Sequence, residues 1–231
     1  CHNCLIPLNE RQCSSLLRVI CRECGAEQVT VSLLKNSKDK GSHSSRHKED
    51  DTIDNFLKTW TQKQGKEIID IPDSLYRKLD QYFSSRGMPT GAEVKLLPLN
   101  ANKKRGNTNH DMLHDALKII KEPEYYKNMD YIGREYFGWV NYDYEHLRPI
   151  VIKDYLETQA VYLSLDISFR ERKSSQGTQF RLRKHLQMRG FIMPQSEFKI
   201  AKNPQSRRNH ERIWKIMVEQ SGNPEHRYIE D

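Results

Sequence analysis

Apolar residues recur at helical spacing through most of the chain after residue 51. The first stripe comprises Ile53, Phe56, Leu57 and Trp60, which follow the i, i+3, i+4, i+7 spacing of one buried helix face. Further stripes are Leu75, Leu79, Tyr82 and Phe83; Leu113, Ala116, Leu117 and Ile120; Leu156, Ala160, Leu163 and Ile167; and Ile213, Trp214 and Met217. The pattern predicts a mainly α fold, with a helical domain over residues 52–231.

Residues that favour helix ends mark the expected limits of these helices. The start signals are Asp51, Pro72, Thr108 in a capping box with Asp111, Pro149 and Ser206, and the stop signals are Gly87, Pro123, Gly222 and Pro224. Residues 94–99 fit a short strand, and the aromatic-rich tract 135–144 is expected to form a loop or hairpin. Residues 35–51 contain no large apolar side chain, which predicts a flexible linker.

All five cysteines lie in the first 24 residues. Four of them, Cys1, Cys4, Cys21 and Cys24, form two C-x-x-C pairs with sixteen residues between the pairs. Each pair can place two sulfurs on one metal through a tight turn, and two pairs complete a tetrahedron with bonds of about 2.3 Å. The runs 16–20 and 29–31 fit short β-strands beside the second pair. Residues 1–34 are therefore predicted to be a zinc ribbon that folds around one Zn²⁺.

Other interpretations of the cysteines have less support. A disulfide framework needs a secreted context and an even number of cysteines, and a redox C-x-x-C needs a surrounding βαβ pattern. Cys13 is left as a free thiol, and His2 is an alternative to one of the thiolates. A site with four protein ligands has no open position, so we expect the zinc to be structural rather than catalytic.

Composition and charge narrow the class of partner. No apolar run approaches the roughly 18 residues of a membrane span, and no signal-peptide pattern is present, so no membrane partner is expected. The formal net charge is +7. This charge favours a polyanion such as nucleic acid as the partner, with a merely soluble basic protein as the alternative.

The positive charge is concentrated in residues 170–215, which hold thirteen Lys and Arg against three Glu, a net charge of +10. Such a field suits phosphate binding through counterion release. The candidate nucleic-acid contacts are Arg170, Arg172, Lys173, Arg181, Arg183, Lys184, Arg189, Lys199, Lys202, Arg207 and Arg208, and Arg212 and Lys215 complete the basic segment.

The helix expected over residues 177–190 has Leu182 and Leu186 on its inner side. Arg181, Lys184 and Arg189, together with Gln187, would then face a groove of double-stranded DNA. A second basic helix follows, so the segment suits a helix-turn-helix-like reader. An ordinary solvated helix face is the alternative.

No catalytic constellation stands out. His110 and His114 lie at i, i+4 on a predicted helix, a spacing that can hold a metal, but no third ligand is evident. The sequence contains no Walker A loop, G-x-S-x-G or G-x-G-x-x-G, and its acidic residues show no nuclease-like pairing. Neither an enzymatic activity nor a small-molecule substrate is expected.

The order of motifs along most of the chain resembles the poxvirus-type late transcription factor three family of large nucleocytoplasmic DNA viruses, especially its giant-virus members. The motifs are C-x-x-C…C-x-x-C-G at the start, F-x-x-x-W at 56–60, IPDSLYRKLDQYF from Ile71, ALKIIKEPEYY ending at Tyr126, QFRLRKHL from Gln179, SEFKIAK from Ser196 and HERIW at 210–214. The cysteine pattern is common among proteins, whereas the order of the later motifs is more specific.

This resemblance implies a zinc-binding, non-enzymatic factor that helps viral RNA polymerase to transcribe late genes, with the four paired cysteines as zinc ligands. It implies viral RNA polymerase or other late transcription factors as partners. The expected location is the infected host cell, in a cytoplasmic viral factory or the nucleus, with packaging in the virion a further expectation. Two other hypotheses remain: a protein-interaction adaptor without direct DNA binding, and a DNA-processing enzyme such as a nuclease.

Overall fold

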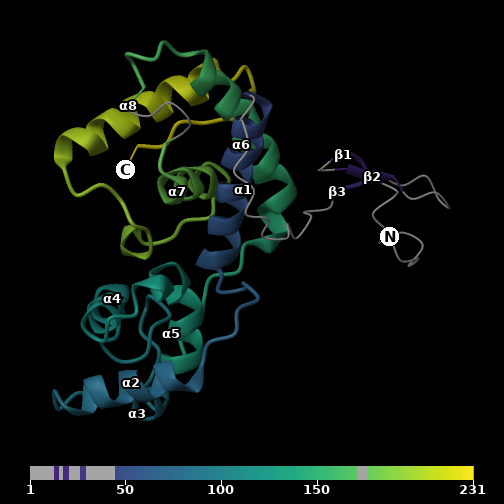
Figure 1. Ribbon diagram of the computed structural model, residues 1–231. Coiled ribbons are helices and arrows are strands. Elements are labelled where there is room, and N and C mark those ends of the chain that lie inside the picture. Colours follow the sequence, from purple (N-terminus) through teal and green to yellow (C-terminus); the bar gives the residue numbers. More distant parts are fainter. Residues whose placement is uncertain (1–12, 16–17, 21–26, 30–44, 171–175, 231) are drawn as a thin grey trace. The chain divides into compact units, whose positions relative to one another are not determined.

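The computed structural model describes residues 13–15, 18–20, 27–29, 45–170 and 176–230 (Figure 1). The chain divides into two compact units, Cys1–His43 and Ser44–Asp231. The four cysteines of the predicted zinc site lie outside the described residues, so that site stays a prediction.

Three short strands form an antiparallel sheet in the first unit. They are β1 (Cys13–Ser15), β2 (Arg18–Ile20) and β3 (Glu27–Val29), in that spatial order. Val19 on the central strand lies opposite Cys13 of β1 and Gln28 of β3. β2 falls within the segment 16–20, and β3 ends where the second expected strand begins.

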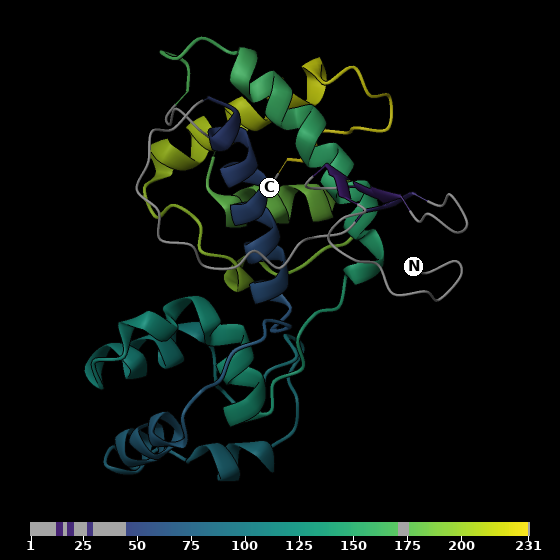
Figure 2. The ribbon, with the colours of Figure 1, turned by 45° about the vertical axis from the view of Figure 1, so that its right-hand side comes forward.

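The second unit is mainly helical, as the apolar pattern predicts. Its described helices are α1 (Ser45–Lys63), α2 (Asp73–Ser84), α3 (Gly91–Lys95), α4 (His110–Ile119), α5 (Met129–Phe137), α6 (Arg148–Ser164), α7 (Thr178–Met188) and α8 (Pro204–Gln220), with 3-10 turns η2 (Pro123–Asn128), η3 (Glu145–Leu147) and η4 (Gln195–Glu197). Figures 1 and 2 show α2 to α5 gathered on one side of this unit and α1, α6, α7 and α8 on the other. Among the described helices, none has the length and apolar character needed to cross a membrane.

Three hydrophobic clusters form the core of the helical unit. The first lies among α2 to α5 and includes Phe83 and Phe137. The second joins α1, α6 and α7 around Trp60 and Tyr155, and the third joins α6, α7 and α8 around Trp214. The stripes predicted on α1, α2, α4 and α8 all pack into these clusters, so those four helix faces are confirmed.

The stripe predicted on α6 is wrong. Leu156 is 45% exposed, and Ile167 lies beyond the helix and is 55% exposed. The buried face of α6 is instead partly polar and includes Asp154, Thr158 and Gln159. Because burial of polar groups is tolerated only when they are hydrogen-bonded, this face depends on partners from distant segments, which an apolar pattern cannot reveal.

Two predicted helix starts are wrong because the helices begin earlier. α1 starts at Ser45, six positions before Asp51, so the last part of the expected linker is helical. α8 starts at Pro204 rather than Ser206, because the side chain of Asn203 accepts a hydrogen bond from a backbone N–H of the first turn. Proline then occupies the first helical position, where it is favoured.

The capping box predicted at the start of α4 is also wrong. Asn109 is the cap, and its Oδ1 accepts the backbone N–H of Met112 at 2.9 Å. Thr108 is engaged elsewhere: its hydroxyl donates to the carbonyl of Arg105 and accepts the indole N–H of Trp139. A buried tertiary contact therefore takes the side chain that the local pattern assigned to a helix end.

Of the two irregular segments, the strand expected over 94–99 is wrong, whereas the loop expected within 135–144 is confirmed from Gly138 onward. Within the tract 94–99, Val94 and Lys95 end the short helix α3, and only Leu99 forms a β-bridge, with Arg105. α3 starts where the backbone N–H of Thr90 donates to the Glu93 carboxylate. The tract 135–144 begins as the last turn of α5 and continues as a loop after Gly138, whose φ of 69° suits glycine at a helix end.

Candidate nucleic-acid interface

The α7 helix buries two of the cations predicted to contact DNA. Arg181 and Lys184 are 0% and 1% exposed. The Arg181 guanidinium donates to Oε1 of Gln159 at 2.9 Å and to Oγ1 of Thr158 at 2.8 Å. It also donates to the carbonyl of Tyr155 at 3.3 Å and lies 4.5 Å from the centre of that ring. This cation is therefore part of the core.

The other two cations predicted to face a groove, Lys184 and Arg189, are engaged in ion pairs. Nζ of Lys184 lies 2.8 Å from the Glu211 carboxylate of α8. The Arg189 guanidinium donates twice to Asp154 of α6, at 2.6 and 2.5 Å, and once to Glu225 at 2.9 Å. The prediction that Arg181, Lys184 and Arg189 face a groove is wrong, because these side chains fasten α7 to α6, α8 and the C-terminal segment.

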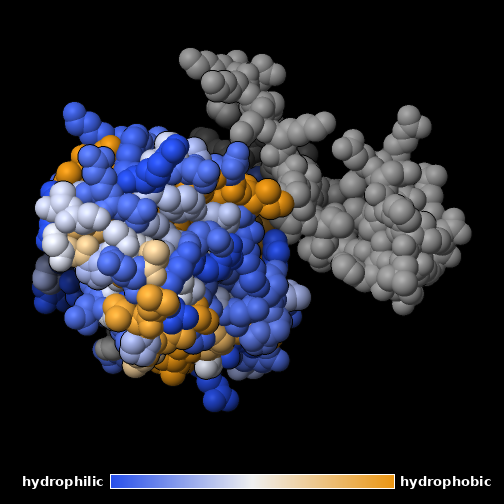
Figure 3. Space-filling view, turned by 90° about the horizontal axis from the view of Figure 1, so that it is seen from below, coloured by the Kyte–Doolittle hydropathy of each residue, from blue (hydrophilic) through white to orange (hydrophobic). Residues whose placement is uncertain are grey.

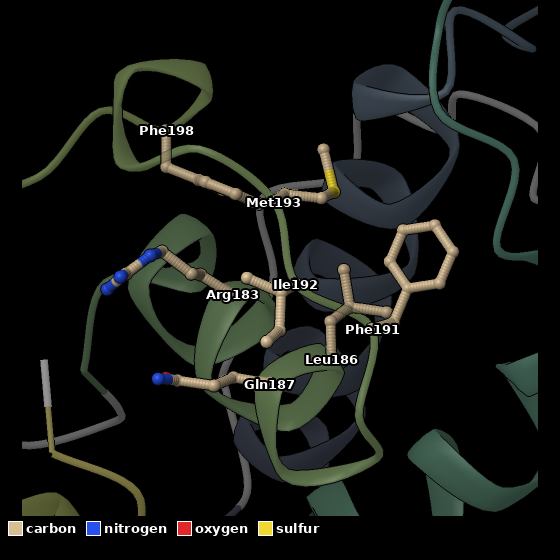
Figure 4. A pocket seen from close by; sticks show the side chains of 7 residues that line it. All are labelled: Arg183, Leu186, Gln187, Phe191, Ile192, Met193 and Phe198. Atoms are coloured by element: carbon tan, nitrogen blue, oxygen red, sulfur yellow. The ribbon is translucent and has the colours of Figure 1, made fainter. Parts of the chain in front are cut away.

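Arg183 and Gln187 lie on a different side of α7, at a small pocket. Figure 4 shows their polar ends pointing away from the apolar side chains that line the rest of it. Those apolar residues are Leu186, Phe191, Ile192, Met193 and Phe198. Both polar side chains are half-buried.

The remaining cations before α7 are placed only in part. Arg170 is half-buried and lies 5.6 Å from the ring centre of Tyr162. Arg172 and Lys173 lie outside the described residues.

The cations around α8 face solvent. Arg208, Arg212 and Lys215 lie at i, i+4 and i+7 and therefore share one side of the helix. Trp214 and Met217 mark the opposite, buried side. The exposed cations, called the α8 basic face below, are Lys199, Lys202, Arg207, Arg208, Arg212 and Lys215.

Acidic side chains neutralise little of the α8 basic face. Five of its six cations form no ion pair within residues 45–170 and 176–230. The sixth, Lys215, lies 3.9 Å from Glu219, and both side chains are more than half exposed, so the pair contributes little. Glu197 and Glu211, the described acids of the basic segment 170–215, are engaged by buried lysines.

Two guanidiniums of this face are held by neutral groups. Arg212 stacks 4.3 Å from the ring centre of Phe169 and donates to Oδ1 of Asn209 at 2.8 Å. Arg207 donates to the carbonyl of Ala201 at 2.8 Å. Such contacts restrict the side chains without cancelling their charge, which favours binding of an anion.

A buried histidine–carboxylate group joins three separate elements. Nε2 of His110 at the start of α4 lies 2.9 Å from Oδ1 of Asp130 in α5, and its Nδ1 lies 3.9 Å from Glu197 in η4. The sequence indicated no third metal ligand near His110, and the structure supplies these two carboxylates. His114 does not join them and lies instead beside Asp115 at 3.5 Å.

Lysines already balance the charge of that group. Nζ of Lys63 lies 2.7 Å from Asp130, and Nζ of Lys104 lies 3.0 Å from Glu197. Burial alone would raise the pKa of Asp130, but Lys63 and His110 hold it below its ordinary value. A divalent cation would add two positive charges to a balanced group, so the arrangement suits a structural ion-pair network rather than a metal centre.

A second such cluster fixes the C-terminal segment. Nε2 of His226 lies 3.0 Å from Asp154 and 3.4 Å from Glu157. Burial tends to raise the pKa of Asp154, but hydrogen bonds from Arg189 and His226 hold it below its ordinary value. Since Arg189 engages both oxygens of Asp154, this cluster is also a structural ion-pair network.

The exposed cations around α8 are therefore the part of the predicted interface that the described structure leaves open to a partner. Comparison with protein-family models, curated proteins and solved structures finds no match to this chain.

Proposed function

We propose that this chain is a zinc-containing, non-enzymatic factor for late viral transcription that binds double-stranded DNA through the α8 basic face. The observation that carries the DNA-binding part is the set of exposed cations on and just before α8, five of which form no ion pair with a carboxylate of the described residues. The late-transcription part rests on the motif order that resembles the viral family. Viral RNA polymerase on late promoters is the proposed setting of this activity.

The chemistry of the α8 basic face supports phosphate contacts. Arginine guanidiniums present planar donors that match phosphate oxygens. One helix side with three cations can follow a charged backbone, and each phosphate neutralised releases condensed counterions. The exposed side of α8 itself carries cations and no leucine or aromatic residue, so this helix suits contacts with the phosphate backbone.

A double substitution tests this interface. Arg208→Ala combined with Arg212→Ala is expected to raise the Kd for a duplex roughly tenfold or more, because two charge-assisted hydrogen bonds to phosphate are lost. Fluorescence anisotropy with a labelled duplex at fixed salt measures the change.

The matched control is Arg77→Ala combined with Arg86→Ala, which removes two exposed arginines from the α2 region. This control is expected to bind DNA with nearly wild-type affinity. Equal losses in the two double variants would show that overall charge, rather than the α8 basic face, determines binding.

The predicted zinc site has its own test. Purified protein is expected to contain about one zinc per chain, in keeping with one tetrahedral four-thiolate site, and Cys21→Ser is expected to lose it. Cys13→Ser is the matched control, because Cys13 is not among the four predicted ligands. Metal analysis by mass spectrometry makes the measurement; a Cys21→Ser protein that keeps its zinc, or a wild-type protein without any, would contradict the prediction.

A further inference from the structure

A loop after α3 exposes three leucines together. Leu96, Leu97 and Leu99 are 86%, 38% and 44% exposed. Val140 is 44% exposed and adjoins the loop, because its backbone N–H donates to the carbonyl of Lys103 at 3.0 Å. In the view from below, hydrophobic residues gather in patches on a largely hydrophilic face (Figure 3). Single exposed apolar residues need no explanation, whereas contiguous ones mark interaction sites.

This segment, called the leucine loop (residues 95–106), is held by its own hydrogen bonds. Oδ1 of Asn100 accepts the backbone N–H groups of Asn102 and Lys104 at 2.9 and 3.0 Å. The Arg105 guanidinium donates to the carbonyls of Leu97 at 2.7 Å and of Gly138 at 2.9 Å. The leucines are therefore presented at fixed positions before any partner binds, which lowers the entropy cost of association.

Gly106 and the buried end of Lys104 complete this arrangement. Gly106 has a φ of 55°, a left-handed conformation that favours glycine, and Cδ1 of Leu97 lies 2.8 Å from the place that a Cβ would take. Nζ of Lys104 is buried against Glu197 and ties the base of the loop to η4. The loop is thus anchored in the helical unit while its leucines remain outside.

The leucine loop itself carries charge of one sign, and the exposed Glu93 just before it accepts the backbone N–H of Thr90 at the start of α3. Residues 94–108 contain four Lys and Arg and no Asp or Glu, and the adjoining residues 136–142 contain no Asp, Glu, Lys or Arg. Glu197 neutralises only Lys104. Arg105 contacts carbonyl groups, and Nζ of Lys103 lies over the Tyr142 ring at 4.5 Å, so both keep their charge. Apolar side chains with a basic border favour a partner that is apolar and acidic.

We propose that the leucine loop docks an acidic amphipathic segment of a partner protein. Nucleic acid would gain no stacking from leucines. A bilayer would not need leucines at fixed positions, whereas the side chains of a protein segment meet fixed positions with fixed spacing. The leucines follow α3, which lies on the side of the helical unit away from α8 (Figure 1), and the proposal does not depend on DNA binding.

Peptide selection followed by affinity measurement tests this docking. The probe is a displayed library of random peptides of about 16 residues, enough for four helical turns, selected on the full-length protein. Selection is expected to enrich peptides that combine Leu, Ile or Phe with Asp and Glu. A selected peptide is expected to bind Leu96→Ser/Leu99→Ser with a Kd raised roughly tenfold or more, because two buried leucines are lost from the interface.

The matched control is Ile119→Ser/Ile192→Ser, which removes two exposed isoleucines elsewhere and is expected to leave peptide affinity within twofold of wild type. Enrichment of basic peptides, no enrichment, or equal binding to both double variants would overturn the proposal. Two observations on the wild-type protein would also overturn it, if Leu96→Ser/Leu99→Ser abolished them. They are dimerisation measured by light scattering and flotation with phosphatidylserine–phosphatidylcholine vesicles. Duplex affinity should be unchanged in this variant, so failure here is distinct from failure of the DNA-binding proposal.

Discussion

Arg181→Ala is expected to lower the free energy of unfolding by about 3–5 kcal/mol, the range for creating a cavity and breaking a buried polar network. The guanidinium is fully buried and donates to Gln159, Thr158 and Tyr155. Its removal leaves a cavity beside the Tyr155 ring and deprives the oxygen atoms of Gln159 and Thr158 of their charged donor. The expected loss is large because both effects fall on the same site.

Denaturant titration followed by tryptophan fluorescence measures this loss, since all three tryptophans lie in the helical unit. Arg208→Ala is the matched control: it removes the same side chain from an exposed position and should change stability by no more than about 0.5 kcal/mol. The two variants should differ in the opposite sense in DNA affinity. Arg208→Ala should bind DNA more weakly than the wild type, whereas the folded fraction of Arg181→Ala should bind it normally. Equal stability of the two variants would contradict the assignment of Arg181 to the core.

Stability of the helical unit is expected to fall as pH drops below 6.5, because His185 is buried in its neutral form. Burial lowers the pKa of His185 from 6.5 to about 3, and the neighbouring Arg181 cation adds to this effect. Nδ1 lies 2.6 Å from the carbonyl of Arg181, which can only accept, so Nδ1 carries the proton. Nε2 is then unprotonated and lies 3.1 Å from the Thr158 hydroxyl.

The direction of the pH effect follows from this lowered pKa. Between pH 6.5 and about 3 the unfolded chain binds a proton at His185 that the folded chain does not. The full contribution to stability is therefore present above pH 6.5 and decreases by about 1.4 kcal/mol per pH unit below it. The carboxylates with lowered pKa, Asp130 and Asp154, add their own loss mainly near and below pH 3.8, the ordinary value for Asp.

Denaturation at several pH values between 6.5 and 4.5 isolates the histidine. His185→Asn retains an amide N–H for the Arg181 carbonyl but cannot be protonated, so its stability should depend less steeply on pH than that of the wild type. His146→Asn, at an exposed position, should retain the wild-type slope. Identical slopes for wild type and His185→Asn would contradict the burial of a neutral imidazole.

The sequence predicts those helices whose buried faces are apolar. On α1 and α8 the stripes ending at Trp60 and Met217 have the spacing of one face, and hydrophobic burial is enough to orient such a helix. The same wheel for α8 places Arg208 and Arg212 roughly opposite Met217, so the outward side of this helix can be predicted from spacing.

The polar contacts of the core are not readable in this way. Arg181 and Arg208 have the same charge, and only the position of Gln159 and Thr158, more than twenty residues away in sequence, distinguishes the buried arginine from the exposed one. Likewise, Asp154 meets His226 across 72 positions. A local sequence pattern predicts that charged residues lie at the surface. Here tertiary hydrogen bonds stabilise some of them in the core instead.

The candidate site likewise depends on contacts between distant segments, which the sequence pattern does not reveal. His110, Asp130 and Glu197 meet only because α4, α5 and η4 pack together, so no sequence motif predicts this cluster. The lysines that make this group structural, Lys63 and Lys104, come from two further segments. The predicted basic segment contains the exposed cations. Its charge alone does not distinguish them from the buried cations that join α7 to its neighbours.

The salt dependence of duplex binding tests the α8 basic face most directly. Kd is measured over a range of salt concentrations for the wild-type protein and for Arg208→Ala/Arg212→Ala. If the two arginines contact phosphates, the slope of log K against log salt should be steep and negative for wild type and smaller in magnitude by about 2 in the double variant. An unchanged slope in the double variant, or wild-type binding that does not respond to salt, would contradict phosphate recognition by this face.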